Sequence, residues 1–357
     1  MNPHDIVRSE AEPLVETVEI KTYFKTPRGI ARAVDGVSIQ IRRGQSLGVV
    51  GESGSGKTVL SRSIMGLLPR NGVIREGSVR YQGQEIGNRS SKEMRAIWGR
   101  EMAMIFQDPM TSLNPVMKVG KQITESLRLH LGMSASEAMT IAEKLFRDVR
   151  IPEPTRRLNQ YPHELSGGMR QRVMIAIAMA CGPNMLFADE PTTALDVTVQ
   201  AQILELISEQ KRDRNMSLLL VTHNLGVVAG YTDEIAVMYG GKVVEKAPTK
   251  TLFADTKMPY TEALLRSIPR LDQPSHSRLA TIPGRPPDIV HPPKGCRFAP
   301  RCAYVRDLCL HEEPELQQAS TPDHTYRCFY PVGSPEYLER KVELPRKGEL
   351  VSTGDLS

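Results

Sequence analysis

The sequence predicts an α/β fold built around a largely parallel sheet, and three observations support this prediction. Short apolar runs alternate with helical patterns along most of the chain, which is typical of strands and helices packed in layers. A glycine-rich loop at 51–58 stands directly between a strand pattern and a helix pattern. The alternation fades near residue 247. We therefore expect one α/β domain over 14–250 and a separate extension over 251–333.

The elements before the glycine-rich loop, and the one that follows it, can be placed from their apolar runs. Arg42-Arg43-Gly44 marks a turn, and the run after it leads straight into the loop. The helical pattern behind the loop ends at Pro69, because proline cannot continue a helix. Strands are expected at 15–24, 34–41 and 46–50, and a helix at 57–68.

Further strands and helices alternate after residue 70. A hairpin is expected to turn near Gln82-Gly83, and Ser134 with Glu137 fits a capping box at the start of a helix. The short apolar runs are expected to be buried strands of the sheet. The hairpin is expected over 78–86, strands at 103–106, 185–188 and 217–221, and helices behind Ser134, at 167–180 and at 197–211.

The glycine-rich loop has the complete pattern of a phosphate-binding loop. Successive backbone N–H groups of such a loop point at phosphate oxygens, and glycines let the backbone approach closely. Lys57 is expected to reach the β- and γ-phosphates, and the Thr58 hydroxyl to ligate Mg²⁺. The sequence therefore predicts binding of a nucleoside triphosphate with Mg²⁺. The loop residues are Gly51, Glu52, Ser53, Gly54, Ser55, Gly56, Lys57 and Thr58.

Polar side chains with catalytic chemistry follow two of the expected strands. Asp189 and Glu190 end the apolar run 185–188, and Gln107 follows the run 103–106. Asp189 suits the role of holding Mg²⁺ through its water shell. Glu190 lies at the carboxyl edge of a strand, where a carboxylate can polarise an attacking water as general base. The amide of Gln107 can contact both the metal shell and that water.

A second motif indicates which family of nucleoside-triphosphate-binding proteins the chain resembles. Leu165-Ser166-Gly167-Gly168-Met169-Arg170-Gln171-Arg172 opens an apolar helix more than a hundred residues after the phosphate loop. With this motif in place, residues 15–250 resemble the nucleotide-binding domain of ABC transporters. The resemblance implies that His223, at the end of the strand at 217–221, is catalytic. The matching features, in the family's order, are the phosphate loop, Gln107, 165–172, Asp189-Glu190, Ala194-Leu195-Asp196 and His223.

The resemblance implies a particular form of the α/β fold and a head-to-tail pair of domains. The fold is the P-loop NTPase cassette: a RecA-like core, an antiparallel β-subdomain, and a helical signature subdomain at about 108–175. ATP and Mg²⁺ are the implied ligands, and each ATP lies between the phosphate loop of one chain and the signature of the other. Asp196 would communicate across the interface. The signature residues expected to act on the partner's ATP are Ser166, Gly167, Gly168 and Gln171.

The amino-acid sequences of three segments are similar to those of the oligopeptide/dipeptide importer subfamily. These segments are Phe106 to Pro115, Asp189 to Gln200, and the C-terminal stretch from Pro259 through Gly295-Cys296-Arg297-Phe298-Ala299-Pro300-Arg301-Cys302. The resemblance implies an ATPase at the cytoplasmic face of the cell membrane that drives uptake of di- or oligopeptides. Nickel, glutathione or an oligosaccharide are alternative cargoes. The implied partners are a second, different ABC ATPase, two integral-membrane permease subunits and an extracytoplasmic solute-binding protein.

The extension contains four cysteines whose spacing suggests a soft-metal site. Cys296, Cys302, Cys309 and Cys328 occur within little more than thirty residues. Thiolates suit an iron–sulfur cluster or structural zinc, and free or incidental thiols are the third reading. Because some members of the resembled subfamily carry a [4Fe–4S] cluster here, the resemblance favours the cluster over Zn²⁺.

The composition is that of a globular protein and does not predict a membrane-spanning one. The apolar content of 40% and net charge of +5 are ordinary for a globular domain. The sequence contains no run of 18 or more apolar residues, so it predicts no membrane span. A soluble ABC ATPase that acts on nucleic acid is the competing function, but the sequence contains one cassette and no RNA-binding motif, so we expect no nucleic-acid partner. Residues 1–13 are expected to be a flexible tail and 334–357 to be disordered.

Overall fold

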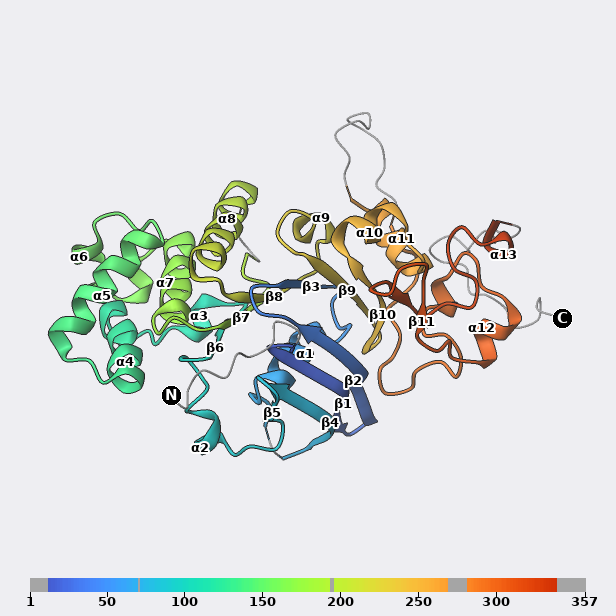
Figure 1. Cartoon of the computed structure of the whole chain (residues 1–357), viewed down its shortest axis with the longest axis horizontal. Helices are drawn as coiled ribbons and strands as arrows, with labels where there is room; N and C mark the ends of the chain where they lie inside the picture. The colour runs from blue at the N-terminus through green and yellow to red at the C-terminus, as the bar shows by residue number, and fades with distance from the viewer. Residues whose placement is uncertain (1–11, 70, 193–195, 269–280, 339–357) are drawn as a thin grey trace, which may run out of the picture.

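The structure, a computed structural model, describes residues 12–69, 71–192, 196–268 and 281–338 (Figure 1). The flexible tail expected at 1–13 therefore lies almost entirely outside the described residues, as does most of the disordered tail expected at 334–357. Its first residues are ordered, because Pro335–Leu338 forms the short helix α13. The described chain contains two sheets, a group of helices at one end and a C-terminal extension at the other.

The smaller sheet is antiparallel and lies near the N-terminus, as the family resemblance implies. Its strand order is β2-β1-β4-β5, and β1 pairs with both β2 and β4. The predicted hairpin is present, since β4 and β5 turn at Gln82 and Gly83. The strands are β1 (Val15–Thr26), β2 (Gly29–Ile41), β4 (Val73–Tyr81) and β5 (Gln84–Glu85).

The larger sheet confirms the predicted parallel core. Its order is β11-β12-β10-β9-β3-β8-β7-β6, and the five strands from β9 to β6 are parallel neighbours. The antiparallel strands β10, β12 and β11 continue it at one edge. The parallel strands are β3 (Ser46–Val50), β6 (Met102–Ile105), β7 (Met185–Asp189), β8 (Ser217–Thr222) and β9 (Glu234–Tyr239). The edge strands are β10 (Lys242–Pro248), β11 (Gln317–Gln318) and β12 (Thr325–Tyr326).

Five helices lie together at one end of the molecule, on the side where β6 ends the large sheet (Figure 1). The capping box at Ser134 is present: its hydroxyl accepts from the Glu137 amide, and the Glu137 carboxylate accepts from the Ser134 amide. The five helices are α3 (Pro109–Ser112), α4 (Val119–Leu131), α5 (Ala135–Asp148), α6 (Pro154–Arg157) and α7 (Gly167–Met179). The other helices of this part are α1 (Lys57–Ile64), α2 (Ser91–Met94), α8 (Val197–Arg214) and α9 (Leu225–Val228).

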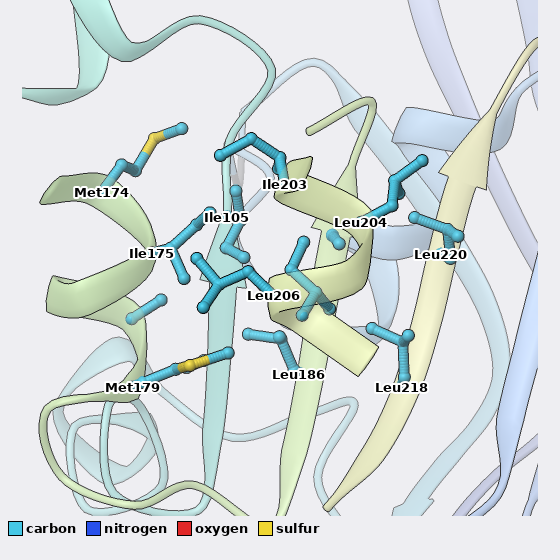
Figure 2. Close-up of a cluster of buried hydrophobic side chains, with 14 of the residues drawn as sticks. Ile105, Met174, Ile175, Met179, Leu186, Ile203, Leu204, Leu206, Leu218 and Leu220 are labelled. Carbon is cyan, nitrogen blue, oxygen red and sulfur yellow. The ribbon is translucent and has the colours of Figure 1, made fainter. Parts of the chain in front are cut away.

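The large sheet is buried on both faces, which explains its continuous apolar strands. In β8, Leu218 and Leu220 belong to one hydrophobic cluster, and Leu219 and Val221 to another. This division follows from the alternation of side chains along a strand. Figure 2 shows the first cluster, where residues of α7 and α8 pack against Ile105, Leu186 and the two leucines of β8.

The C-terminal extension packs on the core. Strand β12 pairs with β10, and Phe298 belongs to the same hydrophobic cluster as the sheet. A fully buried hydrogen bond ties the two parts together: His324 Nε2 lies 2.9 Å from Glu245 Oε1. Residues 281–298 contain no helix or strand. The helices from residue 249 to 311 are α10 (Thr249–Ala254), α11 (Pro259–Arg266) and α12 (Asp307–His311).

Candidate nucleotide-binding site

The phosphate loop lies between β3 and α1, where the sequence predicts it. Gly51 and Gly56 have φ values of 152° and 103°. A Cβ atom at Gly51 would lie 2.2 Å from the Met238 carbonyl oxygen, and one at Gly56 would lie 2.1 Å from the Ala33 carbonyl oxygen. No residue other than glycine fits this approach, and the resulting tight loop directs backbone N–H groups toward the position where a phosphate would bind.

Lys57 lies inside the loop. Its residue is only 4% exposed, and its ammonium donates to the carbonyl oxygens of Gly51 at 2.8 Å and Glu52 at 3.0 Å. Burial lowers the pKa of this lysine, although the nearby carboxylates of Glu190, Asp189 and Glu52 oppose that effect. The ammonium is thus positioned at the loop, and an incoming phosphate would replace the two carbonyls as its acceptor.

Thr58 and Asp189 provide oxygen atoms suited to Mg²⁺. The Thr58 hydroxyl donates to Asp189 Oδ1 at 2.8 Å. Asp189 is fully buried, and its Oδ2 has no hydrogen-bond partner among the described residues. Burial raises the pKa of this carboxyl group. A buried carboxylate oxygen without a partner is costly unless a cation or its water shell completes the site, so these residues fit Mg²⁺.

Replacing Asp189 with asparagine is expected to raise the thermal unfolding midpoint of the nucleotide-free, Mg²⁺-free protein at neutral pH. Because the pKa of Asp189 is raised on folding, folding is penalised once the carboxyl group ionises, and that penalty grows as pH rises through the raised pKa. The gain in unfolding midpoint should vanish below a pH of about 3.9, the pKa of the carboxyl group in the unfolded chain, because the group is then protonated in both the folded and the unfolded protein. Thermal denaturation from acidic to neutral pH measures it.

The same variant provides its own functional control. Mg²⁺-ATP should raise the midpoint of the native chain but not that of the variant, because asparagine is a poor ligand for a hard divalent cation. A variant less stable than the native protein at neutral pH would contradict the assignment of Asp189 as a desolvated carboxylate with one unpaired oxygen.

Gln107, Glu190 and His223 meet at the carboxyl ends of three adjacent strands. Gln107 Nε2 donates to Glu190 Oε2 at 3.1 Å, and His223 Nδ1 lies 3.5 Å from the same oxygen. The Glu190 side chain is 12% exposed and that of His223 is 57% exposed. The structure therefore brings the three sequence-predicted catalytic residues together, with Glu190 at the centre.

Glu190 also has an unusual backbone. Its φ is 45°, in the left-handed region that non-glycine residues rarely adopt, and its amide donates to the Val221 carbonyl of β8 at 2.9 Å. Such strain persists where surrounding structure imposes it, and it is common at functional sites. The carboxylate of this strained residue is the one that accepts the hydrogen bond from Gln107.

The signature segment lies apart from the phosphate loop of the same chain. Figure 1 shows α7 among the helices at one end, whereas α1 lies against the centre of the sheet. Ser166 is the exposed N-cap of α7 and accepts from the Met169 amide at 3.3 Å, and Gly167 is also exposed. The N-terminus of this helix is therefore open to an anion supplied from outside the chain.

Gln171 differs from the other signature residues. It is only 2% exposed, and its Nε2 donates to the Pro191 carbonyl at 2.5 Å. Its side chain is thus bound within its own chain and links α7 to the segment after Asp189 and Glu190. Because the side chain is engaged in this way, the geometry gives no support to the prediction that Gln171 reaches the partner's ATP. The sequence could not reveal this, since a pattern of residue types does not show which side of a helix faces inward.

Asp196 caps α8 at the surface. Its Oδ1 accepts from the Val199 amide at 2.9 Å, and the adjacent Val197 is 81% exposed. An exposed valine beside an exposed carboxylate is compatible with a contact to another subunit. Residues 193–195, which precede Asp196 in the predicted motif, lie outside the described part of the chain.

Two residues that sequence reasoning did not assign contact the phosphate loop. The Glu52 amide donates to the Tyr260 hydroxyl at 2.9 Å, and the Glu52 carboxylate is paired with Arg301. Both partners lie more than two hundred residues further along the chain. No local pattern predicts such contacts.

The four cysteines of the extension line one small cavity. It has a volume of about 20 Å³ and is otherwise lined mainly by apolar and aromatic side chains. Burial raises the pKa of Cys296 to about 11 and that of Cys302 to about 12. Across the described ranges, no group of three or more His, Cys, Asp or Glu residues has the arrangement of a metal site. The cavity has room for about one water molecule, so it does not fit a [4Fe–4S] cluster as it stands.

The described residues include no helix that is both long and apolar enough to cross a bilayer.

Two family models match the chain. The model described as ABC transporter matches residues 34–193, and the model described as oligopeptide/dipeptide transporter, C-terminal region, matches residues 244–309. The second match covers the extension up to Cys309.

Curated relatives match nearly the whole chain. The oligopeptide transport ATP-binding protein OppD of Salmonella typhimurium is 46% identical over 90% of this chain and 95% of its own length. OppD of Bacillus subtilis is 48% identical over 86% of each chain. The dipeptide transport ATP-binding protein DppD of Escherichia coli is 46% identical over 89% of this chain and 97% of its own.

Solved structures agree with this assignment. A dimeric bacterial ABC transporter cassette superposes with a TM-score of 0.60 at 26% identity, covering 66% of this chain and 98% of that one. A dimeric post-hydrolysis cassette bound to ADP and phosphate gives the same values. The fold, the ordered motifs and the identities together establish that this chain belongs to the ABC transporter ATP-binding family, in the branch with the oligopeptide/dipeptide transporter C-terminal region.

Proposed function

We propose that the protein is the ATP-hydrolysing subunit of an ABC importer that takes up di- or oligopeptides. The observation that carries this proposal is the Gln107–Glu190–His223 cluster beside Thr58 and Asp189, in a chain whose relatives are named as peptide transport ATP-binding proteins. The peptide cargo rests on those relatives, because selectivity would lie in subunits other than this one.

The residues divide the hydrolysis of ATP between them. The loop amides and Lys57 bind the β- and γ-phosphates, while Thr58 and Asp189 hold Mg²⁺, which neutralises phosphate charge. Glu190 orients and deprotonates the attacking water as general base. Gln107 and His223 both lie within reach of Glu190 Oε2. They orient that carboxylate and stabilise the charge that develops during hydrolysis.

The signature acts on an ATP bound by a second subunit. Ser166 and Gly167 are exposed at the N-terminus of α7, remote from this chain's own loop, so they are available to a partner's γ-phosphate. Asp196 with its exposed neighbour Val197 lies at the same interface. The partner is a second ABC ATPase, which we expect to be a different chain.

The membrane subunits would contact the segment after Gln107. Met110 and Val116, which follow Gln107 in the sequence, are 55% and 83% exposed. These exposed fractions are high for large apolar residues, and exposed apolar residues close together suit a contact with another protein. Arg170 of the signature helix contacts the Met110 sulfur, so movement at this surface can pass to α7. Two permease subunits and an extracytoplasmic binding protein complete the importer, and this chain lies at the cytoplasmic face of the membrane.

Purification of the chain from its native membrane tests this function. The chain should co-purify with integral-membrane subunits and a second ATPase, and vesicles containing the complex should accumulate labelled peptide when given ATP. A complex made with Lys57→Ala is the matched control and should accumulate none. Uptake of nickel, glutathione or an oligosaccharide instead would correct the cargo, and a chain without any membrane partner would favour a soluble, non-transport ATPase.

We also propose that Cys296, Cys302, Cys309 and Cys328 bind a metal centre, a [4Fe–4S] cluster in preference to Zn²⁺. The convergence of four thiols on one cavity supports this, although the cavity must open to admit a cluster. Because burial raises the pKa values of Cys296 and Cys302, metal binding would release protons from these thiols, since thiolates are the ligands.

Iron, zinc and acid-labile sulfide analysis of anaerobically purified protein checks the metal proposal. Cys296→Ser should lose the metal, whereas Cys181→Ser should retain it, because Cys181 lies in the segment after α7 and its thiol faces the Ser126 carbonyl. Protein that contains neither iron nor zinc would leave the four cysteines as packed thiols.

A further inference from the structure

A buried arginine of the extension holds a carboxylate of the phosphate loop. Arg301 Nη1 and Nη2 donate to Glu52 Oε2 at 2.5 Å and Oε1 at 2.9 Å, across 249 residues of sequence. The Arg301 side chain is 3% exposed and that of Glu52 is 27% exposed. Bidentate pairs of this kind fix both partners in one geometry.

Arg301 is itself firmly placed. Its Nε donates to the Pro283 carbonyl at 2.8 Å, Nη1 to the Tyr239 hydroxyl at 3.2 Å, and Nη2 to the Ile282 carbonyl at 3.3 Å. Burial by itself would lower the pKa of this guanidinium, but the hydrogen bonds with Glu52 and Tyr239 outweigh burial and raise the pKa above its ordinary value. Arg301 therefore stays charged at all relevant pH values.

The Glu52 backbone is held at the same time. Its amide donates to the Tyr260 hydroxyl at 2.9 Å, and its carbonyl accepts from Lys57. Tyr260, Tyr239 and Phe298 form one aromatic cluster, with ring centroids 4.4–5.3 Å apart. The second residue of the loop is thus fixed through its side chain and its backbone by segments that follow the α/β core.

Charge gives this contact a consequence for nucleotide binding. A carboxylate in a loop that accepts a triphosphate repels the ligand, and the repulsion is strong where burial reduces solvent screening. Arg301 supplies the compensating positive charge to Glu52. Without it, the loop would carry an uncompensated negative charge beside the phosphates.

We propose that Arg301 is a positioning residue for ATP, which neutralises and orients Glu52 so that the phosphate loop accepts the triphosphate. This proposal rests on the ATP-binding function proposed above. It makes the C-terminal extension part of the nucleotide site, so that ATP affinity depends on the docked state of the extension.

The chain offers a matched control in Arg297. This arginine lies in the same segment, its side chain is 7% exposed, and it pairs with Asp35 of β2 and the Gly240 carbonyl. It therefore fixes the extension to the core by a buried ion pair, as Arg301 does, but within the described part of the chain none of its hydrogen bonds or ion pairs reaches the phosphate loop. Arg297→Gln reports what loss of docking alone does.

Calorimetric titration of the full chain with Mg²⁺-ATP and Mg²⁺-ADP tests the proposal. Arg301→Gln should weaken ATP binding about tenfold or more, and should weaken ADP binding less because ADP carries less charge. Adding Glu52→Gln should restore much of the lost ATP affinity. Arg297→Gln should lower the thermal unfolding midpoint to a similar degree while changing ATP affinity little.

The outcomes separate the alternatives. Equal losses of ATP and ADP affinity without recovery in the double variant, or equal losses in Arg297→Gln and Arg301→Gln, would show a purely structural role. If Arg301→Gln does not fold, Glu52→Gln alone is decisive: it should raise ATP affinity by leaving Arg301 uncompensated, and a fall overturns the proposal. A native chain that binds no ATP would refute the proposed function itself, whereas native binding that Lys57→Ala abolishes and Arg301→Gln leaves intact would refute only this inference.

Discussion

Replacing Glu190 with glutamine is expected to abolish ATP turnover while ATP binding remains. The carboxylate receives Gln107 Nε2 at 3.1 Å and lies 3.5 Å from His223 Nδ1, so it is the group best placed to take a proton from water. Glutamine keeps the shape but cannot accept that proton, and loss of a general base costs about 10²–10⁴-fold in rate. Steady-state phosphate release measures the loss, and calorimetry measures the retained affinity.

A matched glutamate separates chemistry from a general charge effect. Glu205 lies on the exposed face of α8 and makes only a 3.7 Å surface ion pair with Arg212, so Glu205→Gln should hydrolyse ATP at the native rate. Glu190→Gln should also trap ATP and stabilise the closed pair of ATPase subunits. If Glu190→Gln retained most of the native turnover, another residue would have to be the base.

Lys57→Ala is expected to abolish ATP binding, and with it hydrolysis. The buried ammonium, now held by the carbonyls of Gly51 and Glu52, is the principal positive charge within the loop itself. Loss of a buried, charge-assisted contact to phosphate costs several kcal/mol, on the order of 10²-fold or more in affinity. Titration with Mg²⁺-ATP checks this result.

The Lys57 variant should remain folded. Burial lowers the pKa of Lys57, which means that the folded environment disfavours its charged form, and removal of that charge relieves the penalty. Its thermal midpoint without nucleotide should therefore lie close to that of Lys144→Ala, an exposed position on α5 that serves as the control. ATP binding by Lys57→Ala at native affinity would contradict the assignment of the loop.

Most of the core fold could be predicted because its signals are local. Apolar runs and glycines predict strand β3 and the loop after it, and the Ser134–Glu137 capping box predicts the start of α5. Strand β9 is not predicted although its six residues are buried, and the sequence does not show that β10 turns back beside it. Strands β11 and β12, two residues each, have no detectable periodicity, and they form by pairing: β12 pairs with β10, and β11 pairs with β12.

The candidate site divides in the same way. Thr58, Asp189, Glu190 and Gln107 follow from motif and strand end, and the structure joins them by hydrogen bonds in two pairs, Thr58 with Asp189 and Gln107 with Glu190. The partner of a side chain is not a local property, however. Gln171 is bound to its own chain, and the contact of Arg301 with the loop depends on how the extension folds back across the sheet edge.

The central claim is that the phosphate loop and the signature of this chain serve two different ATP molecules. The structure of the assembled importer carrying Glu190→Gln, trapped with Mg²⁺-ATP, tests it most directly. The account predicts that the ATP on Lys57 and Thr58 touches the signature of the partner ATPase, while Ser166 and Gly168 of this chain touch the partner's ATP. A single ATP contacted by Lys57 and Ser166 of the same chain would contradict it.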